Sequence, residues 1–549
     1  MSTESKSADA PAGAAPPTLF VRQATGLVRA GKGYDAFLYN VMWSGGALTL
    51  AFMFLLAPTL YPRANLLLTV LISALFGIGG AFLYAMLTRL MPRTGGDYVF
   101  ISRTLHPVLG FLANFSYVFW NMVVAGVYAT YFATYSAGAF LRMLVGYGAS
   151  RSLLSTADWF STSWGIFTSG TVLTIIAAAI FVFGGSRWFF RLQQWTFVIY
   201  ILGAFLLVVL VGLFTSHASF LASFNHYAAN LGVSNAASHV QSSAAKAGYV
   251  PQGFDFHDTL MAVSVAWFIF GFIFSSNYFA GEVKTGRRTQ FYAIPGAVLV
   301  VVILLVITIP AFQGMAGHQF LNQLGIANPA AYGFGGSGAP AYPEIAAIAS
   351  GSPIIGTLII LGFVAGIFAW LPMTIMLASR CMLAWSFDRV VPEKLSEVDE
   401  RTHSPLIAVL IVSIMFISST AVYAFTGWLT TLTVLFPETL TLMVVACTGI
   451  ALPFRRKQLY ESSGTAKRFA GLPVLSIVGG IALLGFAAAE AVMLTDPNSG
   501  TSISTNLNIV LISLGVFFIV GPAIYYTSKW IRNREGVDID LAYAEIPPE

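Results

Sequence analysis

The sequence predicts an all-α membrane protein with about twelve transmembrane helices. Hydrophobic residues make up 57% of the 549 residues, and charged residues make up only 9%. A soluble globular protein carries about 25% charged residues. Twelve apolar segments are also long enough for the roughly 20 residues that a helix needs to cross the hydrocarbon core. The basic residues between these segments then set the orientation of the chain.

Positive charge lies almost entirely on one side of the predicted membrane. Of the 28 Lys and Arg residues, all but Arg63, Arg142, Arg151 and Lys246 fall in the tails and connections of one face. Because positively charged connections stay in the cytoplasm, both termini are predicted to be cytoplasmic, in a multi-pass protein of the cell membrane. The same distribution explains the net charge of +5 without a nucleic-acid-binding patch, so no nucleic acid is expected as a partner.

The predicted transporter domain, residues 37–530, lies between two polar tails. Residues 1–36 are rich in Ala, Pro and Ser and are expected to form a disordered cytoplasmic tail that is too polar for a signal peptide. Residues 531–549 form the second cytoplasmic tail. The predicted spans are residues 38–58, 66–90, 107–140, 165–185, 190–214, 259–282, 289–312, 353–386, 405–426, 428–452, 471–494 and 506–530.

The first ten spans are predicted to form an inverted repeat of five plus five helices, with helices 11 and 12 following at 471–530. Repeat one covers about 37–214 and repeat two about 258–452. The polar connection 91–106 then corresponds to 313–352, which is rich in Gly, Pro and Ala and is expected to form a lid with a short helix near Tyr342–Ser350. Transporters with such repeats bind substrate near the midplane, between interrupted helices.

Two interruptions are predicted, in the first and sixth spans. Ser44-Gly45-Gly46 could free backbone N–H groups that bind a carboxylate, although tight helix packing by small residues is an equal alternative. In the sixth span Gly271 lies among aromatic residues and precedes three consecutive polar residues at membrane depth. The aromatic residues that could wall a pocket there, or else face lipid or fill the bundle, are Trp267, Phe268, Phe270 and Phe274.

Three motifs resemble those of amino acid–polyamine–organocation permeases. The stretch PRTGGDYVF at 92–100 is similar to the signature between their second and third helices, and GEVK at 281–284 to the motif that ends their sixth helix. The stretches at 378–380 and 387–389 resemble the end of helix eight and its loop. The resemblance covers about residues 36–530.

This resemblance implies the leucine-transporter-type fold, with helices 1 and 6 discontinuous. It also implies that the two breaks bind the α-carboxylate and the α-amino group of an amino acid. The substrate-binding residues that it implies are Ser44, Gly45, Gly46 and Ala47 in the first span and Phe270, Gly271, Phe272, Phe274 and Ser275 in the sixth.

Candidate coupling residues lie in the later spans. Glu438 lies near mid-depth of the tenth span, where an ionisable group is unfavourable by about 2.5–3.5 kcal/mol, so it is either a proton carrier or a structural Glu bonded to a hydroxyl. Glu490 is expected to reach water at the outer end of its span. Thr374 could bind sodium. The fifth span has Ile199 or Tyr200 where some proton-coupled relatives carry a lysine. Sodium, protons and uncoupled exchange therefore remain open, and no other cofactor is expected.

Charged residues at the cytoplasmic face are predicted to form ion pairs that close an inner gate, with plain interfacial anchoring as the alternative. They are Arg93, Asp97, Glu282, Lys284 and Arg288. None of the seven histidines has the spacing of a metal site, and His257-Asp258 is expected to cap the sixth span.

The sequence therefore predicts a secondary active transporter that moves an amino acid by alternating access, as a symporter or antiporter. No acidic residue lies at the expected pocket in spans one, three and six, which favours a neutral or apolar amino acid. A polyamine or organic-cation permease of the same fold is the alternative, and a membrane-embedded enzyme or a substrate sensor are alternatives of other classes. An enzyme is not expected, because no catalytic cluster is found. The sequence does not decide between a monomer and a homodimer.

Overall fold

The computed structural model describes residues 26–284, 286–335, 338–426, 434–463 and 466–544. Within these residues, twelve helical segments are long and apolar enough to cross a membrane, so the predicted spans are confirmed. The predicted start of the tenth span, residue 428, lies outside the described residues.

Several spans consist of more than one helix. The first contains α1 (Gly33–Trp43) and α2 (Gly46–Leu60), and the sixth contains α14 (Phe256–Met261) and α15 (Val263–Phe272). The third contains α5 (Pro107–Val123), α6 (Ala125–Phe132), a π-helical turn (Ala133–Gly138) and α7 (Ala139–Gly146). The fifth contains α10 (Gly185–Ile201), a π-helical turn (Leu202–Leu207) and α11 (Val208–Phe214). The twelfth contains α24 (Leu507–Gly515), a π-helical turn (Val516–Val520) and α25 (Gly521–Arg534). The others are α3 (Leu66–Leu90), α9 (Ser163–Phe183), α16 (Gly286–Ala316), α19 (Pro353–Phe387), α20 (Leu406–Thr426), α21 (Leu435–Arg455) and α23 (Val474–Thr495).

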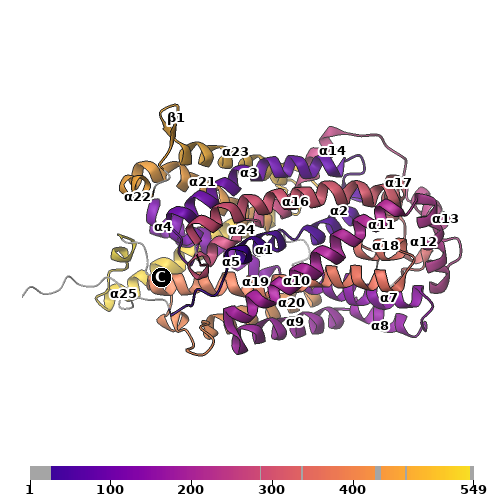
Figure 1. The fold of residues 1–549 in the computed structure, drawn as a ribbon, viewed down its shortest axis with the longest axis horizontal. Coiled ribbons are helices and arrows are strands. Elements are labelled where there is room, and N and C mark those ends of the chain that lie inside the picture. Colours follow the sequence, from indigo (N-terminus) through magenta and orange to yellow (C-terminus); the bar gives the residue numbers. More distant parts are fainter. Residues whose placement is uncertain (1–25, 285, 336–337, 427–433, 464–465, 545–549) are drawn as a thin grey trace, which may run out of the picture.

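Shorter elements lie at the two ends of the bundle. One end carries α4 (Asp97–Thr104), α22 (Lys457–Ser462), the hairpin of β1 (Arg468–Phe469) and β2 (Leu472–Pro473), and a 3-10 segment, Ile539–Ala544. The other end carries α8 (Leu153–Phe160), α12 (His217–Leu231), α13 (Ala236–Lys246), α17 (His318–Ile326) and α18 (Tyr342–Ala349). Figure 1 shows these two groups at opposite ends of the long axis. The first end is named the terminus face and the second the loop face.

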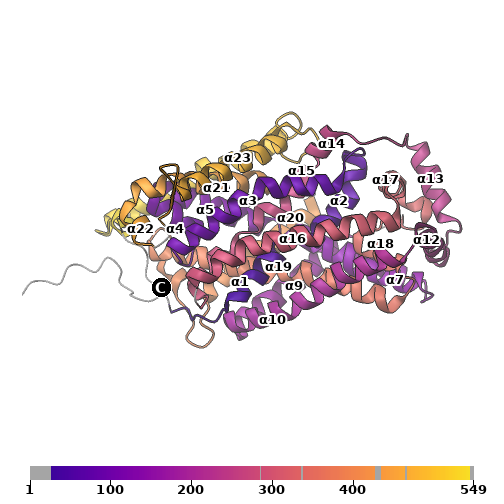
Figure 2. The same cartoon turned by 45° about the horizontal axis from the view of Figure 1, so that its top comes forward.

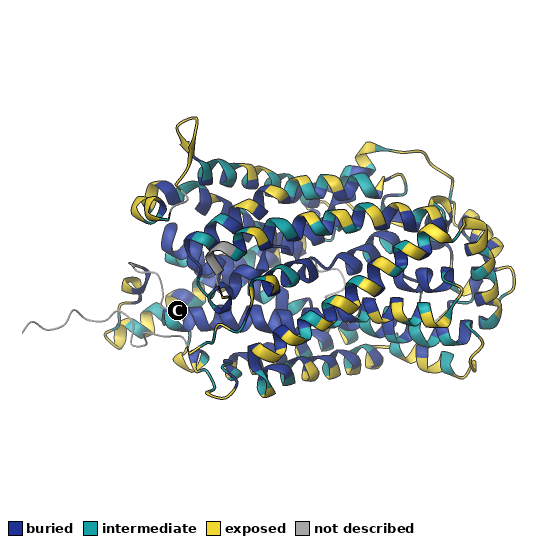
Figure 3. Cartoon of the chain, in the orientation of Figure 1, coloured by how far each residue is buried: buried dark blue, intermediate teal, exposed yellow. Residues whose placement is uncertain are grey.

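The spans lie side by side around a buried centre. The second span, α3, packs against α16 and α23, as Figure 2 shows in the turned view. Figure 3 shows buried residues concentrated in the middle of the bundle and exposed residues on its outward sides. On α16, the exposed apolar side chains Leu299, Ile303 and Ile307 recur every fourth residue, so one helix face is suited to contact lipid.

The predicted lid helix is confirmed as α18. It is fixed by a buried ion pair in which the Arg142 Nη2 atom of α7 lies 2.7 Å from Glu344 Oε2 of α18. Tyr227 of α12 donates a further hydrogen bond of 3.0 Å to Glu344. Three separate elements of the loop face are thereby joined at one carboxylate.

The inverted repeat itself stays a prediction. The first and sixth spans, which correspond in the two halves, are both interrupted. The connection after the second span holds α4 at the terminus face, and the connection after the seventh holds α17 and α18 at the loop face.

Candidate functional site

The first span is interrupted at Ser44 and Gly45, where the sequence predicts a break. The helix α1 ends at Trp43, and Gly45 has a φ of 59°, a left-handed conformation that favours glycine. The Ser44 hydroxyl donates to the Val41 carbonyl at 2.7 Å and so satisfies one carbonyl at the end of α1. A new helix, α2, then begins at Gly46 in the middle of the bundle.

The start of α2 is held by a tyrosine of the fifth span. The first amides of a helix have no carbonyl partner within that helix. The Ala47 N–H donates to the Tyr200 hydroxyl at 3.1 Å. A Cβ on Gly46 would lie 3.5 Å from this hydroxyl and 3.3 Å from the ring of Phe205, so the site is already closely packed. Tyr200 thus positions the positive end of the α2 dipole.

The sixth span loses its α-helical form after Phe272. Its next residues form 3-10 turns at Ser275–Tyr278 and Ala280–Glu282, so the span is interrupted, as the sequence predicts. The Ser275 hydroxyl donates to the Phe272 carbonyl at 2.9 Å and lies 3.0 Å from the Tyr117 hydroxyl of α5. Gly271 lies inside α15, so the interruption follows this glycine instead of containing it.

Asn40 of α1 joins the two broken spans. Its side-chain oxygen accepts from the Ser276 N–H at 2.9 Å, and its amide nitrogen donates to the Ser276 hydroxyl at 2.9 Å. The Ser276 hydroxyl donates in turn to Gln290 of α16 at 2.6 Å. Sequence reasoning gave Asn40 and Gln290 no role, because nothing in either residue's local pattern shows which helix it faces.

The aromatic side chains of α15, together with Phe274 just beyond its end, divide between two faces, so Phe270 and Phe274 lie apart from Phe272. Phe270 packs against Gly77 of α3, and Phe274 stacks on Tyr84 with ring centroids 4.9 Å apart. Both therefore face the second span and not the break in the first. Phe268 and Phe272, also four residues apart, lie on the face of α15 toward the break and Trp370.

Trp370 of α19 is the centre of an aromatic stack beside the break. Its ring centroid lies 4.3 Å from that of Trp43 and 4.6 Å from that of Tyr128 of α6. A Cβ on Gly45 would lie 3.6 Å from the Trp370 indole nitrogen. Neither Trp370 nor Tyr128 was predicted as a site residue, although Trp43 directly precedes the predicted break.

A small enclosed cavity lies between the first-span break and this stack. Its volume is about 10 Å³, which is enough for about one water molecule. The lining residues are Met42, Gly45, Ala47, Leu48, Tyr128, Tyr200, Phe363, Gly366, Ile367 and Trp370.

Glu438 of α21 lies beside this stack and is fully buried. The Asn121 amide nitrogen of α5 donates to its Oε1 atom at 2.6 Å. A charge on the same carboxyl would interact with the hydroxyl groups of Tyr117 and Tyr128, which lie near it. An asparagine, rather than the hydroxyl that the structural alternative expected, is therefore the partner of Glu438.

Several buried polar atoms in this region have no hydrogen-bond partner among the described residues. They include the acceptors Glu438 Oε2 and Asn121 Oδ1, the indole nitrogens of Trp43 and Trp370, and the hydroxyls of Thr49 and Tyr128. Buried polar groups without partners are rare, and each calls for an explanation such as a ligand. Together with the amides at the start of α2, these atoms can satisfy both charged ends of a zwitterion.

Thr374 lies one turn beyond Trp370 on α19. Its hydroxyl donates to the Trp370 carbonyl at 2.9 Å, and the neighbouring Met373 carbonyl accepts from the Tyr39 hydroxyl at 3.0 Å. Because the Thr374 hydroxyl donates its proton, both of its lone pairs stay available to a ligand. The role of Thr374 in sodium binding stays a prediction.

At the terminus face, Glu282 forms a buried ion pair with Arg380 of α19. The Arg380 Nε atom lies 2.6 Å from Glu282 Oε1, and Ser186 of α10 donates to Oε2 of Glu282 at 2.7 Å. This partner differs from the bases that the sequence pairs with Glu282. Lys284 contributes its backbone N–H, which donates to the Gly31 carbonyl at 2.9 Å. The terminus-face ends of the first and sixth spans are thereby held together.

Asp97, at the start of α4, bonds to hydroxyl and amide groups where the sequence predicts an ion pair. It accepts from Tyr278 at 2.5 Å, from Tyr84 at 3.1 Å and from Asn277 at 3.4 Å. Burial raises the pKa of the Asp97 carboxyl to about 7, although the three donors act to lower it. Arg93 lies half-buried in the same connection.

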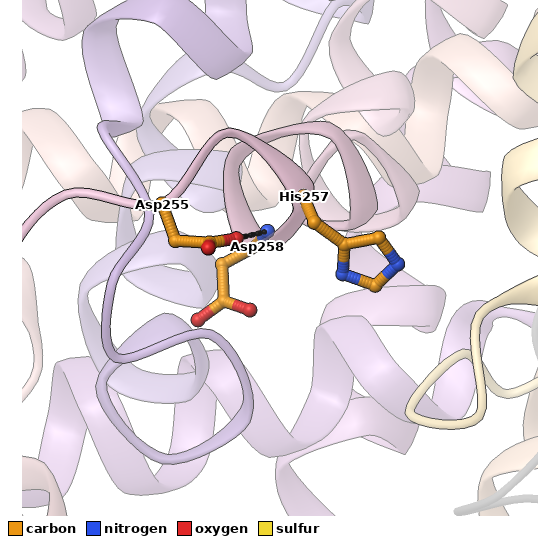
Figure 4. Close-up of side chains that lie close together, drawn as sticks. All are labelled: Asp255, His257 and Asp258. Carbon is orange, nitrogen blue, oxygen red and sulfur yellow. Dashed lines mark hydrogen bonds between the residues drawn. The ribbon is translucent and has the colours of Figure 1, made fainter.

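Two other predicted features are settled by their surroundings. Asp255 caps α14 by accepting from the Asp258 N–H at 2.9 Å, beside His257, as Figure 4 shows. The Arg63 Nη2 atom lies 2.9 Å from Asp255 Oδ2, so the charge of this carboxylate is balanced by an arginine. Glu490 was expected to reach water, but it is buried, and neither of its carboxylate oxygens has a partner among the described residues.

The sequence model of the family described as Amino acid permease matches residues 36–518, from the first span into the twelfth. Comparison with curated proteins gives no match. The family consists of transporters rather than enzymes, in agreement with the three motifs and the twelve spans. The chain therefore belongs to the amino acid permeases of the amino acid–polyamine–organocation superfamily.

Proposed function

We propose that this protein moves a neutral amino acid across the cytoplasmic membrane by alternating access, with the terminus face in the cytoplasm. The observation that carries the proposal is the meeting of a helix start at Gly46 with the unpartnered polar atoms around Trp370 and Glu438. The excess of Lys and Arg in the connections of the terminus face supports this orientation.

The substrate carboxylate would bind at the start of α2. The α2 dipole places partial positive charge at Gly46, and the indole N–H of Trp370 lies beside the same turn. The substrate ammonium would bind near the carbonyls at the end of α15, where the helix dipole is negative, and near the free oxygen of Glu438. The substrate side chain would contact the rings of Tyr128, Phe268 and Phe272.

Closure at both faces supports alternating access. The Glu282–Arg380 ion pair joins the sixth and eighth spans at the terminus face, and the Arg142–Glu344 ion pair fixes the lid at the loop face. A substrate reaches the central site only when one of these two sets of contacts separates. On this proposal, the two sets of contacts belong to a closed state that lies between the two open states of the transport cycle.

A cationic amine is the second candidate substrate, and Glu438 favours it. Sequence reasoning searched spans one, three and six for an acid and found none, but α21 brings the Glu438 carboxyl to the same site. A second ammonium group on a basic amino acid or a diamine could pair with this carboxylate.

Uptake into proteoliposomes tests both candidates. Radiolabelled leucine, arginine and putrescine are compared at the same concentration and membrane potential, with empty liposomes as the control. Uptake of leucine that excess putrescine does not inhibit supports the neutral-amino-acid proposal. Uptake of putrescine or arginine without leucine transport assigns the cationic substrate. Binding of leucine without any flux would instead assign a sensor.

A further inference from the structure

The segment Ile539–Ala544, which follows the last span, buries three of its side chains against the bundle. After α25 ends at Arg534, the chain returns toward the bundle, and Ile539 and Tyr543 expose only 1% and 4% of their surface. Burial of these two side chains requires contacts that hold the segment to the bundle.

The segment docks on α4. The Tyr543 hydroxyl lies 3.0 Å from the hydroxyl of Tyr98, and the Arg103 guanidinium lies 4.8 Å from the Tyr543 ring centroid. The Arg103 Nη2 atom also donates to the Ala542 carbonyl at 3.4 Å. Hydrogen bonds and a cation–π contact therefore act at one place.

The docked segment covers a buried ion pair between α4 and the eighth span. The Arg103 Nη2 atom donates to Asp388 Oδ1 at 2.7 Å, just after the end of α19. Arg456, just beyond α21, donates to the Arg103 carbonyl at 2.6 Å and to the Tyr543 carbonyl at 3.3 Å. The C-terminal segment thereby connects α4 to the ends of the eighth and tenth spans.

On its other side, α4 holds the broken half of the sixth span. Asp97, the residue before Tyr98, accepts from Tyr278 at 2.5 Å, and the Gly95 N–H donates to the Tyr278 carbonyl at 3.0 Å. A contact that fixes α4 must therefore also restrain residues 275–282, which close the terminus face.

The outer attachment of the segment is of the releasable kind. Asp540 pairs with Lys529 of α25 and accepts from Tyr525 at 3.4 Å. The Asp540 side chain is 49% exposed and that of Lys529 is 31% exposed. Exposed ion pairs contribute little and are screened by salt, so this outer attachment adds little to the contacts that Tyr543 makes with α4.

We propose that Ile539–Ala544 is an autoinhibitory latch that holds α4 and so keeps the terminus face closed. This inference rests on the proposed alternating access, because a closed face matters only if that face also opens. Release of the segment from Tyr98 and Arg103 shifts the population toward the state that is open at the terminus face.

Cys381 of α19 reports this opening directly. It is fully buried and lies within electrostatic range of Asp97 and Tyr278. The other cysteine, Cys447, is exposed and is replaced in a Cys447→Ser background. The rate at which a maleimide modifies Cys381 then measures how often the terminus face opens.

One truncation and one substitution, each with a matched control, test the latch in proteoliposomes. A stop after Gly536 removes the segment, and a stop after Ala544 is the matched control that keeps it. Tyr543→Ala removes the ring and hydroxyl, with Leu541→Ala as its control because Leu541 is 56% exposed. The stop after Gly536 and Tyr543→Ala should each raise the Cys381 labelling rate on the order of fivefold, with the controls unchanged.

Equal labelling rates in the full-length protein and the stop after Gly536 would overturn the latch. If that truncation lowers the melting temperature, Tyr543→Phe decides, because it keeps the ring over Arg103 and loses only the hydroxyl contact with Tyr98. A labelling rate at the wild-type value in Tyr543→Phe would then also count against the latch. Labelling needs no transported substrate, so faster labelling without amino acid uptake would keep the latch and reject the transport proposal.

Discussion

Asp97 of α4 accepts a hydrogen bond of 2.5 Å from the Tyr278 hydroxyl, in the non-helical end of the sixth span. Tyr84 of α3 and Asn277 donate to the same carboxyl, so one acid joins the second span, the sixth span and the connection between the second and third. Its partners are neutral donors, and its pKa of about 7 therefore reflects burial against hydrogen bonding.

Asp97→Asn should change how stability depends on pH. The carboxyl has a pKa of about 7 in the folded protein and an ordinary value of 3.8, so between these values the folded state binds more protons than the unfolded state. Stability from this group then falls as pH rises toward 7, by at most about 1.4 kcal/mol per pH unit. The asparagine variant lacks this loss, so its melting temperature minus that of the wild type should increase from pH 5 to pH 7.5.

Tyr84→Phe provides the matched comparison for this prediction. It removes a donor that lowers the Asp97 pKa, so the pKa of this carboxyl should be higher in the variant. The stability of the variant should therefore keep falling up to a higher pH than that of the wild type. The melting temperatures of Asp97→Asn and the wild type could also differ by the same amount at every pH. This result would show that Asp97 does not titrate between pH 5 and pH 7.5.

Arg142→Met should destabilise the loop face strongly. Removal of one partner from a buried ion pair leaves an uncompensated charge, here Glu344, and typically costs about 3–5 kcal/mol. The double variant Arg142→Met/Glu344→Met removes both charges and should recover most of the loss. Thermal unfolding measures both variants. A double variant no more stable than Arg142→Met would contradict the ion-pair explanation.

The sequence predicted the spans and breaks better than the partners of single residues. Hydropathy depends on composition along the chain, and an interruption such as Ser44-Gly45-Gly46 is written in local residue types. Whether Phe270 or Phe272 faces the site depends instead on which neighbour each side of α15 meets. The sequence does not state that neighbour, and an all-apolar helix gives no polar face from which to infer it.

Long-range partners were missed for the same reason. Arg380 lies 98 positions from Glu282, and Asn121 lies 317 positions from Glu438. By distance along the sequence, the nearest bases to Glu282 among the predicted gate residues are Lys284 and Arg288. Tyr200 was noticed as the residue in place of a lysine, but its bond to the Ala47 N–H needed the packing of the fifth span against the first.

Gly45→Ala should weaken substrate binding by tenfold or more. The residue has a φ of 59°, where a Cβ costs roughly 1–2 kcal/mol, and the added Cβ would lie 3.3 Å from the Phe268 ring. Gly480→Ala is the control, because no atom lies within 4 Å of a Cβ there. Gly271→Ala, within regular α15, should also have a smaller effect. The shift in melting temperature with added substrate measures affinity. Equal affinities in Gly45→Ala and Gly480→Ala would show that Gly45 only packs helices.

Glu438→Gln should abolish the dependence of uptake on a proton gradient if Glu438 carries the coupling proton. The glutamine keeps the size of the side chain and an acceptor for the Asn121 amide, which donates at 2.6 Å, but it cannot exchange a proton. Exchange of internal for external substrate at equal pH should continue, because this reaction requires no net proton movement. Uptake driven by an imposed pH gradient is compared with such exchange in the same proteoliposomes.

Glu490→Gln is the matched control for Glu438→Gln, because Glu490 is also a buried acid but lies on α23, whereas Glu438 lies beside Asn121 and Tyr128 at the central site. It should leave gradient-driven uptake close to the wild-type rate. Loss of gradient dependence in Glu490→Gln and its retention in Glu438→Gln would transfer the proton site to the eleventh span. If neither variant loses the dependence, the proton is carried by a group other than these two, and the free oxygen of Glu438 is then better explained as a contact for the ammonium group of the substrate.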